Sequence, residues 1–394
     1  MPALYLYDDR VARTFAPFAL TRPAAALRAG ALLVAERWAR ALGVPVAGYV
    51  TSPDLQGFEE PGASPVAPEV LPAGAVVANA RFAPSLARAA ADDVAVWRGG
   101  GRVAAVRLDA PVAAAALVAA EHPPAAAGAE ATLDGWWNDA AWDYVGQLQT
   151  QLAADLPVLA AELDTVEHPG VVLGGGGVYV ERGATVEPYV VFDVNAGPVV
   201  VRRGATVQAF TRVVGPCYVG EHSLVTADRI SGCAIGDHCK VHGEISASVL
   251  VGHANKAHDG FVGHSYLGRW VNLGAGTTTS NLKNTYGTVA LWTPQGVRDS
   301  GLQFLGTLFG DHAKTGIGLT LTTGTVVGAG ANVYERMPPK YVPPFSWGGG
   351  APYDTYDVER FLRVAERAMA RRQLPLTPAM RGLLARAHAR RGDG

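Results

Sequence analysis

Aliphatic residues recur at every sixth position through the middle of the chain, and a glycine often follows them. The pattern aliphatic–Gly–x–x–small–x fits "VGEHSL", "IGDHCK", "LGRWVN", "LGAGTT" and "VGAGAN", all between residues 219 and 332. This is the hexapeptide repeat of a parallel β-helix, in which each hexapeptide makes one short strand and a corner. Because the aliphatic residue points inward and stacks on its counterpart one coil away, we expect a solenoid over residues 169–336.

A different pattern precedes the repeat. The segment "ALYLYDD" indicates a strand, "AALRAGALLVAERWARALG" a helix, and "VAGYV" and "AVVANARFAP" two further buried strands. This alternation predicts an α/β domain over residues 1–168. Functional side chains in such sheets tend to follow strand ends, which makes candidates of six residues. They are Asp8, Asp9, Arg22, Arg28, Asn79 and Arg81.

A third region, residues 337–394, follows the repeat. Its Pro-rich start, residues 337–352, predicts a connector that leaves the solenoid. Apolar residues at helical spacing over 356–373 predict one helix, and Thr377 as N-cap before Pro378 predicts a second. Solenoid ends need covering, and these helices are the candidate cap.

Composition and charge narrow the class of protein. The chain has 394 residues and a formal net charge of −2, which argues against a broad nucleic-acid footprint. It has no run of 18 apolar residues, so no membrane span is expected. The start "MPALYLYDDR" lacks the features of a secretory signal, and three cysteines are too few for a disulfide framework. A cytoplasmic location is the simplest expectation.

Groups able to do chemistry gather in one stretch of the repeat, residues 255–284. His258, Asn272, Asn281 and Lys283 follow one another at coil-related distances, although polar corner residues of a solenoid are often only solvated. A histidine serves as a general base near neutral pH. Asparagine holds a sugar hydroxyl or phosphate oxygen, and lysine meets an anion. This set suits acyl transfer from a thioester to an amine or hydroxyl.

The same stretch carries a family resemblance. "NKAHDGFVGHSYLGRWVNLGAGTTTSNLKN" resembles the acetyltransferase half of the bifunctional glucosamine-1-phosphate N-acetyltransferase and N-acetylglucosamine-1-phosphate uridylyltransferase, which has "KAGH…YLG…VNIGAGT…CN". The whole chain resembles a related branch of sugar nucleotidyltransferases, through "LTRPAAALRAG", "AERW", "NARFAP", "SNLKNTYG" and "FSWGG". The resemblance implies a left-handed coil, a hand that the repeat alone does not indicate, since right-handed crossovers are the general rule.

The resemblance also implies roles in the solenoid, namely acetyl transfer from acetyl-CoA to an amino sugar phosphate or a nucleotide-linked amino sugar. His258 falls on the catalytic histidine. The implied acceptor-binding residues are Lys256, Asp259, Asn272, Asn281 and Lys283. The implied oxyanion contacts are the backbone amides of Gly274, Ala275 and Gly276. The implied acetyl-CoA groove comprises Gly316, Ile317, Gly328 and Ala329. Because acetyl-CoA lies between adjacent solenoids in that family, a homotrimer is implied.

The sequence departs from the family pattern in both the solenoid and the N-terminal domain. Phe261 and Leu282 stand where tyrosines are expected, so the acceptor need not be glucosamine 1-phosphate. The N-terminal half has no G-x-G-T-R loop, and Asn79 stands where a metal aspartate is expected. Arg22 and Arg28 remain candidates for phosphate, and Asp8 or Asp9 for Mg²⁺. Three roles therefore remain open for the N-terminal domain: sugar-1-phosphate nucleotidyl transfer, sugar-phosphate binding by a degenerate domain, or a purely structural role.

Two other functions fit parts of the sequence. A zinc-dependent hydratase of the γ-carbonic anhydrase kind would use His253 and His258, which are five residues apart, with further histidines nearby. Those histidines are His222, His238, His242 and His264. "SNLKN" and the long N-terminal domain have no place in that function, so we expect no metal at the acyl-transfer site. The other alternative is a non-catalytic scaffold that binds nucleotide sugars.

Overall fold

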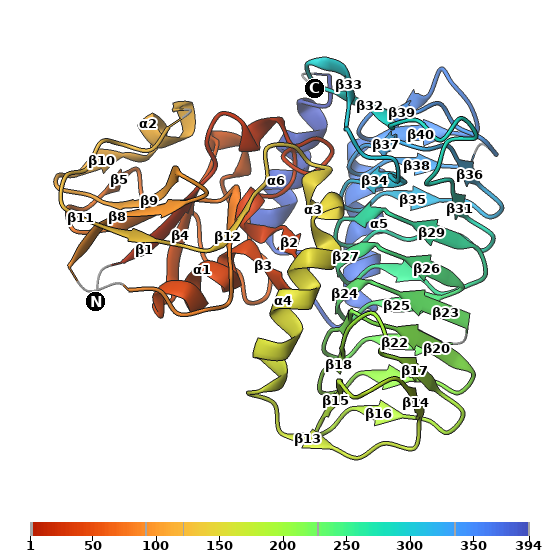
Figure 1. Ribbon diagram of the computed structural model, residues 1–394. Helices are drawn as coiled ribbons and strands as arrows, with labels where there is room; N and C mark the ends of the chain where they lie inside the picture. Colours follow the sequence, from red (N-terminus) through yellow and green to blue (C-terminus); the bar gives the residue numbers. More distant parts are fainter. Residues whose placement is uncertain (1–2, 91–92, 121, 227, 335, 393–394) are drawn as a thin grey trace.

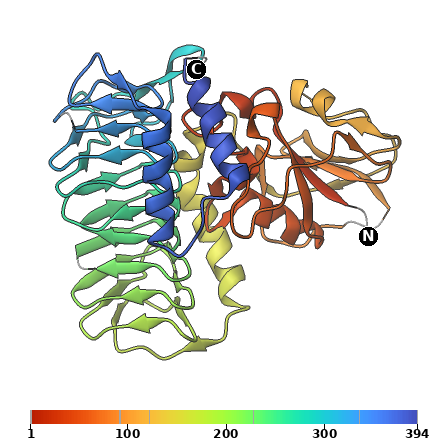
Figure 2. The same ribbon diagram turned by 180° about the vertical axis from the view of Figure 1, so that it is seen from behind.

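The computed structural model describes residues 3–90, 93–120, 122–226, 228–334 and 336–392. An α/β domain lies to one side of a tall β-helix, with helices between the two (Figures 1 and 2). Within the described residues, no helix is both long and apolar enough to cross a bilayer. The predicted fold class is confirmed: an α/β domain, a left-handed parallel β-helix and C-terminal helices.

The N-terminal domain is built on a mixed sheet with the strand order β11–β8–β9–β6–β1–β4. Its strands are β1 (Leu4–Tyr7), β4 (Val46–Val50), β6 (Val76–Asn79), β8 (Val94–Gly99), β9 (Arg102–Arg107) and β11 (Ala129–Thr132). β1 is parallel to both neighbours, β4 and β6, and all residues of β1 and β6 are buried. Residues that follow these strands therefore meet at one edge of the sheet.

Smaller elements complete this domain. The short strand pairs are β2 (Arg28–Ala29) with β3 (Leu32–Leu33), β5 (Val70–Leu71) with β10 (Val112–Ala113), and β7 (Phe82–Pro84) with β12 (Gly135–Trp137). The helices are η1 (Ala12–Thr14), η2 (Ala24–Ala26), α1 (Val34–Leu42), η3 (Pro53–Leu55), α2 (Ala114–Ala119), α3 (Asp143–Gly146) and α4 (Leu148–Ala160). α4 packs on the solenoid, where the Gln149 side chain donates a hydrogen bond to the Gly232 carbonyl, 2.6 Å.

The solenoid has three parallel faces, and the chain visits them in the order 1, 2, 3 in each coil. Face 1 comprises β15 (Val178–Glu181), β18 (Val199–Val201), β21 (Cys217–Val219), β24 (Ala234–Asp237), β27 (Val249–Gly252), β30 (Tyr266–Leu267), β34 (Thr307–Phe309), β37 (Thr325–Val327) and β39 (Tyr341–Val342). Face 2 comprises β16 (Thr185–Val186), β19 (Thr206–Val207), β22 (Leu224–Thr226), β25 (Lys240–His242), β28 (Asn255–Lys256), β35 (Lys314–Thr315), β38 (Asn332–Val333) and β40 (Ser346–Gly348). Face 3 comprises β14 (Val171–Leu173), β17 (Val191–Asp193), β20 (Thr211–Val214), β23 (Asp228–Ser231), β26 (Glu244–Ser246), β29 (Phe261–Gly263), β31 (Thr278–Thr279) and β36 (Thr320–Leu321).

Corners join the faces. We name edge A between faces 1 and 2, edge B between faces 2 and 3, and edge C between faces 3 and 1. Antiparallel additions are β13 (Thr165–Val166) beside β15, β41 (Asp354–Thr355) beside β40, and the hairpin of β32 (Ala290–Thr293) with β33 (Gly296–Asp299). The hairpin belongs to an insertion that separates β31 from β34 (Figure 1).

The predicted aliphatic stack fills the solenoid. On face 1 each inward residue pairs with its counterpart in the next coil. The series is Val201, Val219, Ile235, Leu250, Leu267, Phe309, Val327 and Val342. All are buried. The three cysteines, Cys217, Cys233 and Cys239, are buried in the same core as free thiols and serve there as small apolar residues.

Stacked rings occupy edge A. His222, His238, His253, Trp270 and His312 take positive φ angles at successive corners. Their ring centroids lie 5.0, 4.8, 4.4 and 6.2 Å apart in that order. Histidine tolerates the left-handed conformation better than most side chains. We call these five residues the aromatic ladder; neighbouring rings stack on one another, and His253, Trp270 and His312 are buried.

The ladder makes the fold sensitive to acid. Burial lowers the pKa of His253 and of His312 to about 3, whereas the unfolded imidazole titrates near its ordinary 6.5. The unfolded chain thus binds these protons first, so their stabilisation is present above pH 6.5 and is lost as the pH falls toward 3. For each unit by which the pH falls between 6.5 and 3, we expect His253 and His312 each to reduce the free energy of unfolding by about 1.4 kcal/mol.

Urea unfolding between pH 7 and 4 measures this slope. The charged and titratable groups facing the two rings are Arg22, Arg269, Arg372, Glu60, His238 and Lys314. The variant His253→Asn/His312→Asn keeps side chains that accept positive φ but removes both titrations, so its slope should be shallower. An unchanged slope would assign the acid sensitivity to other groups.

The C-terminal helices are α5 (Val358–Ala370) and α6 (Pro378–Ala389). Asp357 caps α5 and Thr377 caps α6, the latter as predicted, with Pro378 in the first turn. The prediction that they cap a solenoid end is wrong. They lie along its side, between the β-helix and the N-terminal domain (Figure 2). The reason is that Phe361 of α5 packs edge-on against His312 of the ladder and against Phe345.

Candidate functional site

His258 lies on edge B, in the turn between β28 and β29, and is exposed. Lys256 is buried beneath this turn, and its Nζ donates to the carbonyl oxygens of His258 and Asp259. Burial lowers the pKa of Lys256 to about 8. The predicted role of Lys256 as a phosphate ligand needs correction, because its ammonium is occupied in holding the turn that carries His258.

Part of the predicted acyl-transfer site aligns with His258 on edge B. The Gly276 amide donates to the Asp259 carbonyl, 2.8 Å, and the Gly318 amide donates to the Ala275 carbonyl, 2.7 Å. His258, the 274–276 turn and the 316–318 turn therefore stack in successive coils. Two of the predicted oxyanion donors are already engaged, since Gly274 donates to Thr315 Oγ1, 3.0 Å, and Gly276 to Asp259. They form no oxyanion hole in this arrangement.

The predicted acetyl-CoA groove is divided between two edges. Gly316 and Ile317 lie on edge B, after β35, whereas Gly328 and Ala329 follow β37 on edge A. Ala329 is fully buried there, and the Gly328 amide donates to Val342. The grouping was wrong because a hexapeptide match does not say which of three corners it forms.

The asparagines and Lys283 do not gather around His258. The Asn272 side chain on face 2 accepts a hydrogen bond from Asn255, 2.6 Å. Asn281 follows β31 and lies on edge C. Lys283 donates to the Thr288 carbonyl within the insertion. The predicted grouping of these residues with His258 is therefore not formed within one chain.

Asn281 instead meets His264, which follows β29 on edge C. Asn281 Nδ2 lies 2.9 Å from His264 Nδ1, and the Phe304 ring stacks on the imidazole at a centroid distance of 5.1 Å. Burial lowers the pKa of His264. Because Asn281 engages Nδ1, Nε2 is the ring nitrogen left for a substrate. This pair, with Phe304 from the insertion, places a partly buried histidine with a defined side-chain partner on edge C.

Sequence reasoning assigned the catalytic role to His258, although a signal for His264 was present. In "GHSYLG", His264 follows a glycine, as the histidine of "KAGH" does, whereas His258 follows Ala257. His258 and His264 flank the short strand β29. Six residues of extended chain span about 20 Å. Within one chain, only one of the two can serve a given reacting atom.

The N-terminal candidates at the ends of β1 and β6 do meet, but mostly as partners of one another. The buried Asp9 carboxylate accepts hydrogen bonds from Arg81 Nε, Asn79 Nδ2 and the Ala12 amide at 2.8–3.0 Å. Burial raises the pKa of Asp8 to about 8. Asp8 lines a pocket of about 190 Å³ that Trp292 of the hairpin also lines.

Arg22 and Arg28 occupy the interface between the domains, where both are buried. Arg22 pairs with Asp311 of the solenoid, Nε to Oδ2 2.9 Å, and with Glu60, Nη2 to Oε1 2.7 Å. Arg28 donates to the Val251 carbonyl of the solenoid, 3.4 Å, and to the Ala31 carbonyl. Their predicted role as phosphate ligands needs correction, because their donors are committed to protein acceptors away from solvent.

The histidines of the zinc alternative are dispersed. His253 is buried in the ladder on edge A, and His258 is exposed on edge B. His222 and His238 stack in the same ladder as His253. Within the described chain, the pair that the hydratase would need does not converge.

Comparison with known proteins identifies the N-terminal half. Residues 4–163 match the family model described as "Sugar nucleotidyl transferase". Over these residues the N-terminal domain is similar to sugar nucleotidyl transferases. The match ends just after α4, so the helix that docks on the solenoid is part of the sugar nucleotidyl transferase domain.

Two bifunctional proteins match parts of the chain. The chain is 34% identical over 91 residues to a bifunctional sugar-1-phosphate nucleotidylyltransferase/acetyltransferase of Sulfurisphaera tokodaii, which is 23% of each chain. It is 27% identical over 200 residues to the bifunctional protein GlmU of Methanococcus vannielii, 50% of this chain and 42% of the relative. The aligned parts thus span less than half the length of these relatives.

Among solved structures, a UDP-N-acetylglucosamine acyltransferase from Campylobacter jejuni aligns at 12% identity. The alignment covers 55% of this chain and 94% of that chain, with a TM-score of 0.18. At that score it adds nothing to the assignment of the β-helix, which rests on the strand pairing.

Proposed function

We propose that the β-helix transfers an acetyl group from acetyl-CoA to the amino group of a sugar phosphate or a nucleotide-linked amino sugar. The observation that carries the proposal is the His264–Asn281 pair on edge C, with Phe304 stacked on the imidazole. The names of the two relatives, both bifunctional proteins and one an acetyltransferase by name, support the same class of reaction.

In the proposed reaction His264 is the general base. The Asn281 amide group offers either its NH₂ or its carbonyl oxygen to Nδ1. The structure places Nδ2 beside Nδ1, and the base requires the amide turned so that its oxygen accepts from Nδ1–H, which leaves the lone pair of Nε2 free to take a proton. The acceptor amine attacks the thioester carbonyl and loses that proton to Nε2, the C–N bond forms, the C–S bond breaks, and CoA leaves as the thiol. The lowered pKa of His264 keeps the imidazole neutral at pH 7, as a base requires.

We propose that the complete site forms between copies in a homotrimer. His264 lies on edge C, whereas Gly316 and Ile317, half of the predicted acetyl-CoA groove, lie on edge B. Edge B also exposes large apolar side chains: Tyr189 is 71%, Phe210 75% and Ile317 80% exposed. Surfaces of this kind are common at protein interfaces. Edge B of one copy against edge C of the next would join the groove to the base.

For the sugar nucleotidyl transferase domain we propose binding of a sugar nucleotide rather than nucleotidyl transfer. The residues present do not fit Mg²⁺, because the Asp9 carboxylate is saturated by Arg81, Asn79 and the Ala12 amide. Asp8, with its pKa of about 8, is mostly protonated at pH 7. A pocket lined by Asn79, Arg102 and Trp137 supports the binding role. A cytoplasmic location, where acetyl-CoA is available, completes the proposal.

Release of free CoA thiol from acetyl-CoA tests the proposal. The assay runs with a panel of amino-sugar 1-phosphates and nucleotide-linked amino sugars, with and without a chelator. We expect release that requires an acceptor and survives the chelator. Absence of release with every acceptor would move the solenoid to the scaffold alternative, and release abolished by the chelator would return it to a metal-dependent reaction.

A further inference from the structure

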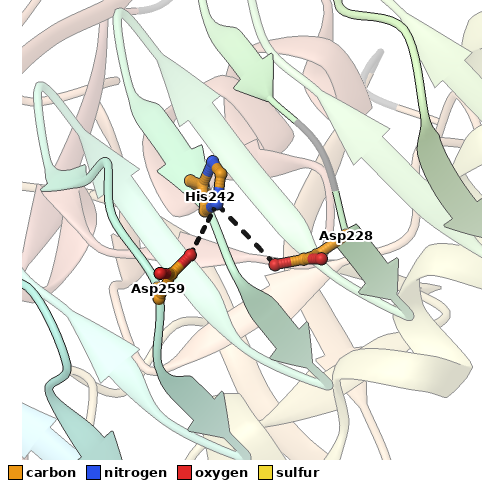
Figure 3. Close-up of side chains that lie close together, drawn as sticks. All are labelled: Asp228, His242 and Asp259. Atoms are coloured by element: carbon orange, nitrogen blue, oxygen red, sulfur yellow. Dashed lines mark hydrogen bonds and ion pairs between the residues drawn. The ribbon is translucent and has the colours of Figure 1, made fainter.

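A histidine lies between two carboxylates on edge B, in neighbouring coils. His242, at the end of β25, has Nε2 2.9 Å from Asp259 Oδ1 and 3.7 Å from Asp228 Oδ2 (Figure 3). One ligand atom from each of the three residues lies within 4.8 Å of the others. His242 is partly buried and the two carboxylates are exposed, so the centre of the cluster is open to solvent.

The other ring nitrogen of His242, Nδ1, contacts the side chain of Thr226. Thr226 Oγ1 lies 3.0 Å from His242 Nδ1 and 3.3 Å from the Val241 carbonyl oxygen. A hydroxyl has one hydrogen, so when Thr226 donates it to Val241 it accepts from Nδ1–H. The lone pair of Nε2 then faces two carboxylates. In this tautomer a cation between the three groups offsets the two negative charges, and a bound metal ion supplies it.

We propose that Asp228, His242 and Asp259 bind a divalent transition-metal ion of the Zn²⁺ kind. Zinc bonds to nitrogen and oxygen of about 2.0–2.1 Å in a tetrahedron place neighbouring ligand atoms about 3.4 Å apart. The two observed separations from Nε2, 2.9 and 3.7 Å, lie on either side of this value. Two carboxylates neutralise the ion, and one imidazole favours Zn²⁺ over Mg²⁺ and Ca²⁺.

The surroundings position these ligands. The Asp259 carbonyl accepts from the Gly276 amide at 2.8 Å and from the buried Lys256 Nζ at 2.9 Å, which holds the turn that carries the carboxylate. The Thr226 hydroxyl is the outer partner that sets the ring nitrogen available to the metal. The site shares edge B with His258 and is separate from the His264–Asn281 pair on edge C. Its three ligands take no part in the proposed acyl transfer.

Zinc uptake by the full chain tests the proposal. In equilibrium dialysis we expect one Zn²⁺ per chain for the wild type, and Co²⁺ in its place should give visible absorption bands. His242→Ala should weaken binding by at least 100-fold. Thr226→Val, which keeps the shape of the side chain, should weaken it by about 10- to 100-fold. Asp259→Asn, an exposed and nearly isosteric change, should also weaken it.

The matched control is His122→Ala, which removes an exposed histidine of the N-terminal domain and should leave uptake unchanged. Equal loss in His122→Ala and His242→Ala would mean adventitious surface binding and would overturn the proposal. So would absence of uptake by the wild type, since an imidazolium ion pair then accounts for the contacts, or equal competition by Mg²⁺. Uptake is measured without acetyl-CoA or acceptor, so its outcome is independent of the transferase assay.

Discussion

Replacing His264 with asparagine lowers acceptor-dependent release of CoA thiol by about 10²- to 10⁴-fold, the usual contribution of a general base. Asparagine accepts the positive φ that His264 adopts, so the corner is preserved. It has no basic nitrogen, so the attacking amine keeps its proton. The measurement is kcat at saturating acetyl-CoA and acceptor, together with KM for the acceptor. We expect the loss to fall on kcat.

The matched comparison is His258→Ala. His258 is an exposed side chain on another edge, on the far side of β29 from His264. We expect His258→Ala to retain most of the activity. Collapse in His258→Ala with activity retained in His264→Asn would restore the assignment made from sequence and would remove the Asn281 contact as the basis of the proposed mechanism.

The second large effect concerns the interface between the two domains. Asp311→Ala should reduce the free energy of unfolding by about 3–5 kcal/mol, the cost of breaking a buried ion pair from one side. The Asp311 carboxylate accepts from Arg22 Nε, from Thr21 Oγ1 and from the Arg269 amide, at 2.8–3.0 Å. Its removal leaves the guanidinium of Arg22, which is 1% exposed, short of a counter-charge. Urea unfolding followed by circular dichroism measures the change.

The control for this prediction is Asp164→Ala. Asp164 forms an ion pair with Arg182, Nε to Oδ2 2.6 Å, in which both side chains are about two thirds exposed. Solvent screens such a pair, so its loss should leave the unfolding midpoint nearly unchanged. If the two variants had equal midpoints, the network around Arg22 would not stabilise the fold.

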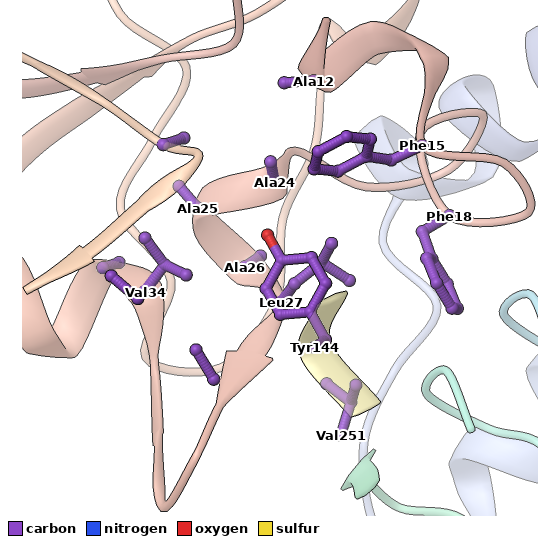
Figure 4. Packing of buried hydrophobic residues seen from close by; sticks show 14 of the residues in the cluster. Ala12, Phe15, Phe18, Ala24, Ala25, Ala26, Leu27, Val34, Tyr144 and Val251 are labelled. Carbon is purple, nitrogen blue, oxygen red and sulfur yellow. The ribbon is translucent and has the colours of Figure 1, made fainter. Parts of the chain in front are cut away.

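Apolar packing at the interface is substantial on the N-terminal side. Phe18 contacts Tyr266 of β30 at a ring-centroid distance of 4.7 Å, and Tyr144 contacts the same ring at 5.7 Å. Figure 4 shows Tyr144 next to Val251 of the solenoid, and Phe15, Phe18 and Leu27 belong to the same buried cluster. One continuous core therefore crosses the interface, and the charged network lies within it.

The sequence by itself determined the repeat, the N-terminal α/β class and the start of α6. These are local properties. An aliphatic residue at every sixth position can be buried only if successive coils stack, and Thr377 before Pro378 is a helix start in any surroundings. The pairing of Val201 with Val219, and of Ile235 with Leu250, is the direct result of that period.

The tertiary structure decided which corner each motif occupies. Paired residues on face 1 are 18 apart at Val199 and Cys217 but 15 apart at Ala234 and Val249, and the insertion separates Tyr266 from Leu308 by 42. Because coil lengths vary, spacing along the chain does not give position around it. For this reason His258 lies apart from Asn281, while His264 meets it.

Long-range contacts likewise determine the partners of the charged side chains in the N-terminal domain. Arg22 and Asp311 are 289 residues apart in sequence, and nothing near Arg22 distinguishes a phosphate ligand from an interface residue. Burial between two domains removes water from the guanidinium, so a carboxylate from the other domain is needed to offset that cost. The sequence determines which residues can be charged or buried, and only the packed structure determines the partners with which they are buried.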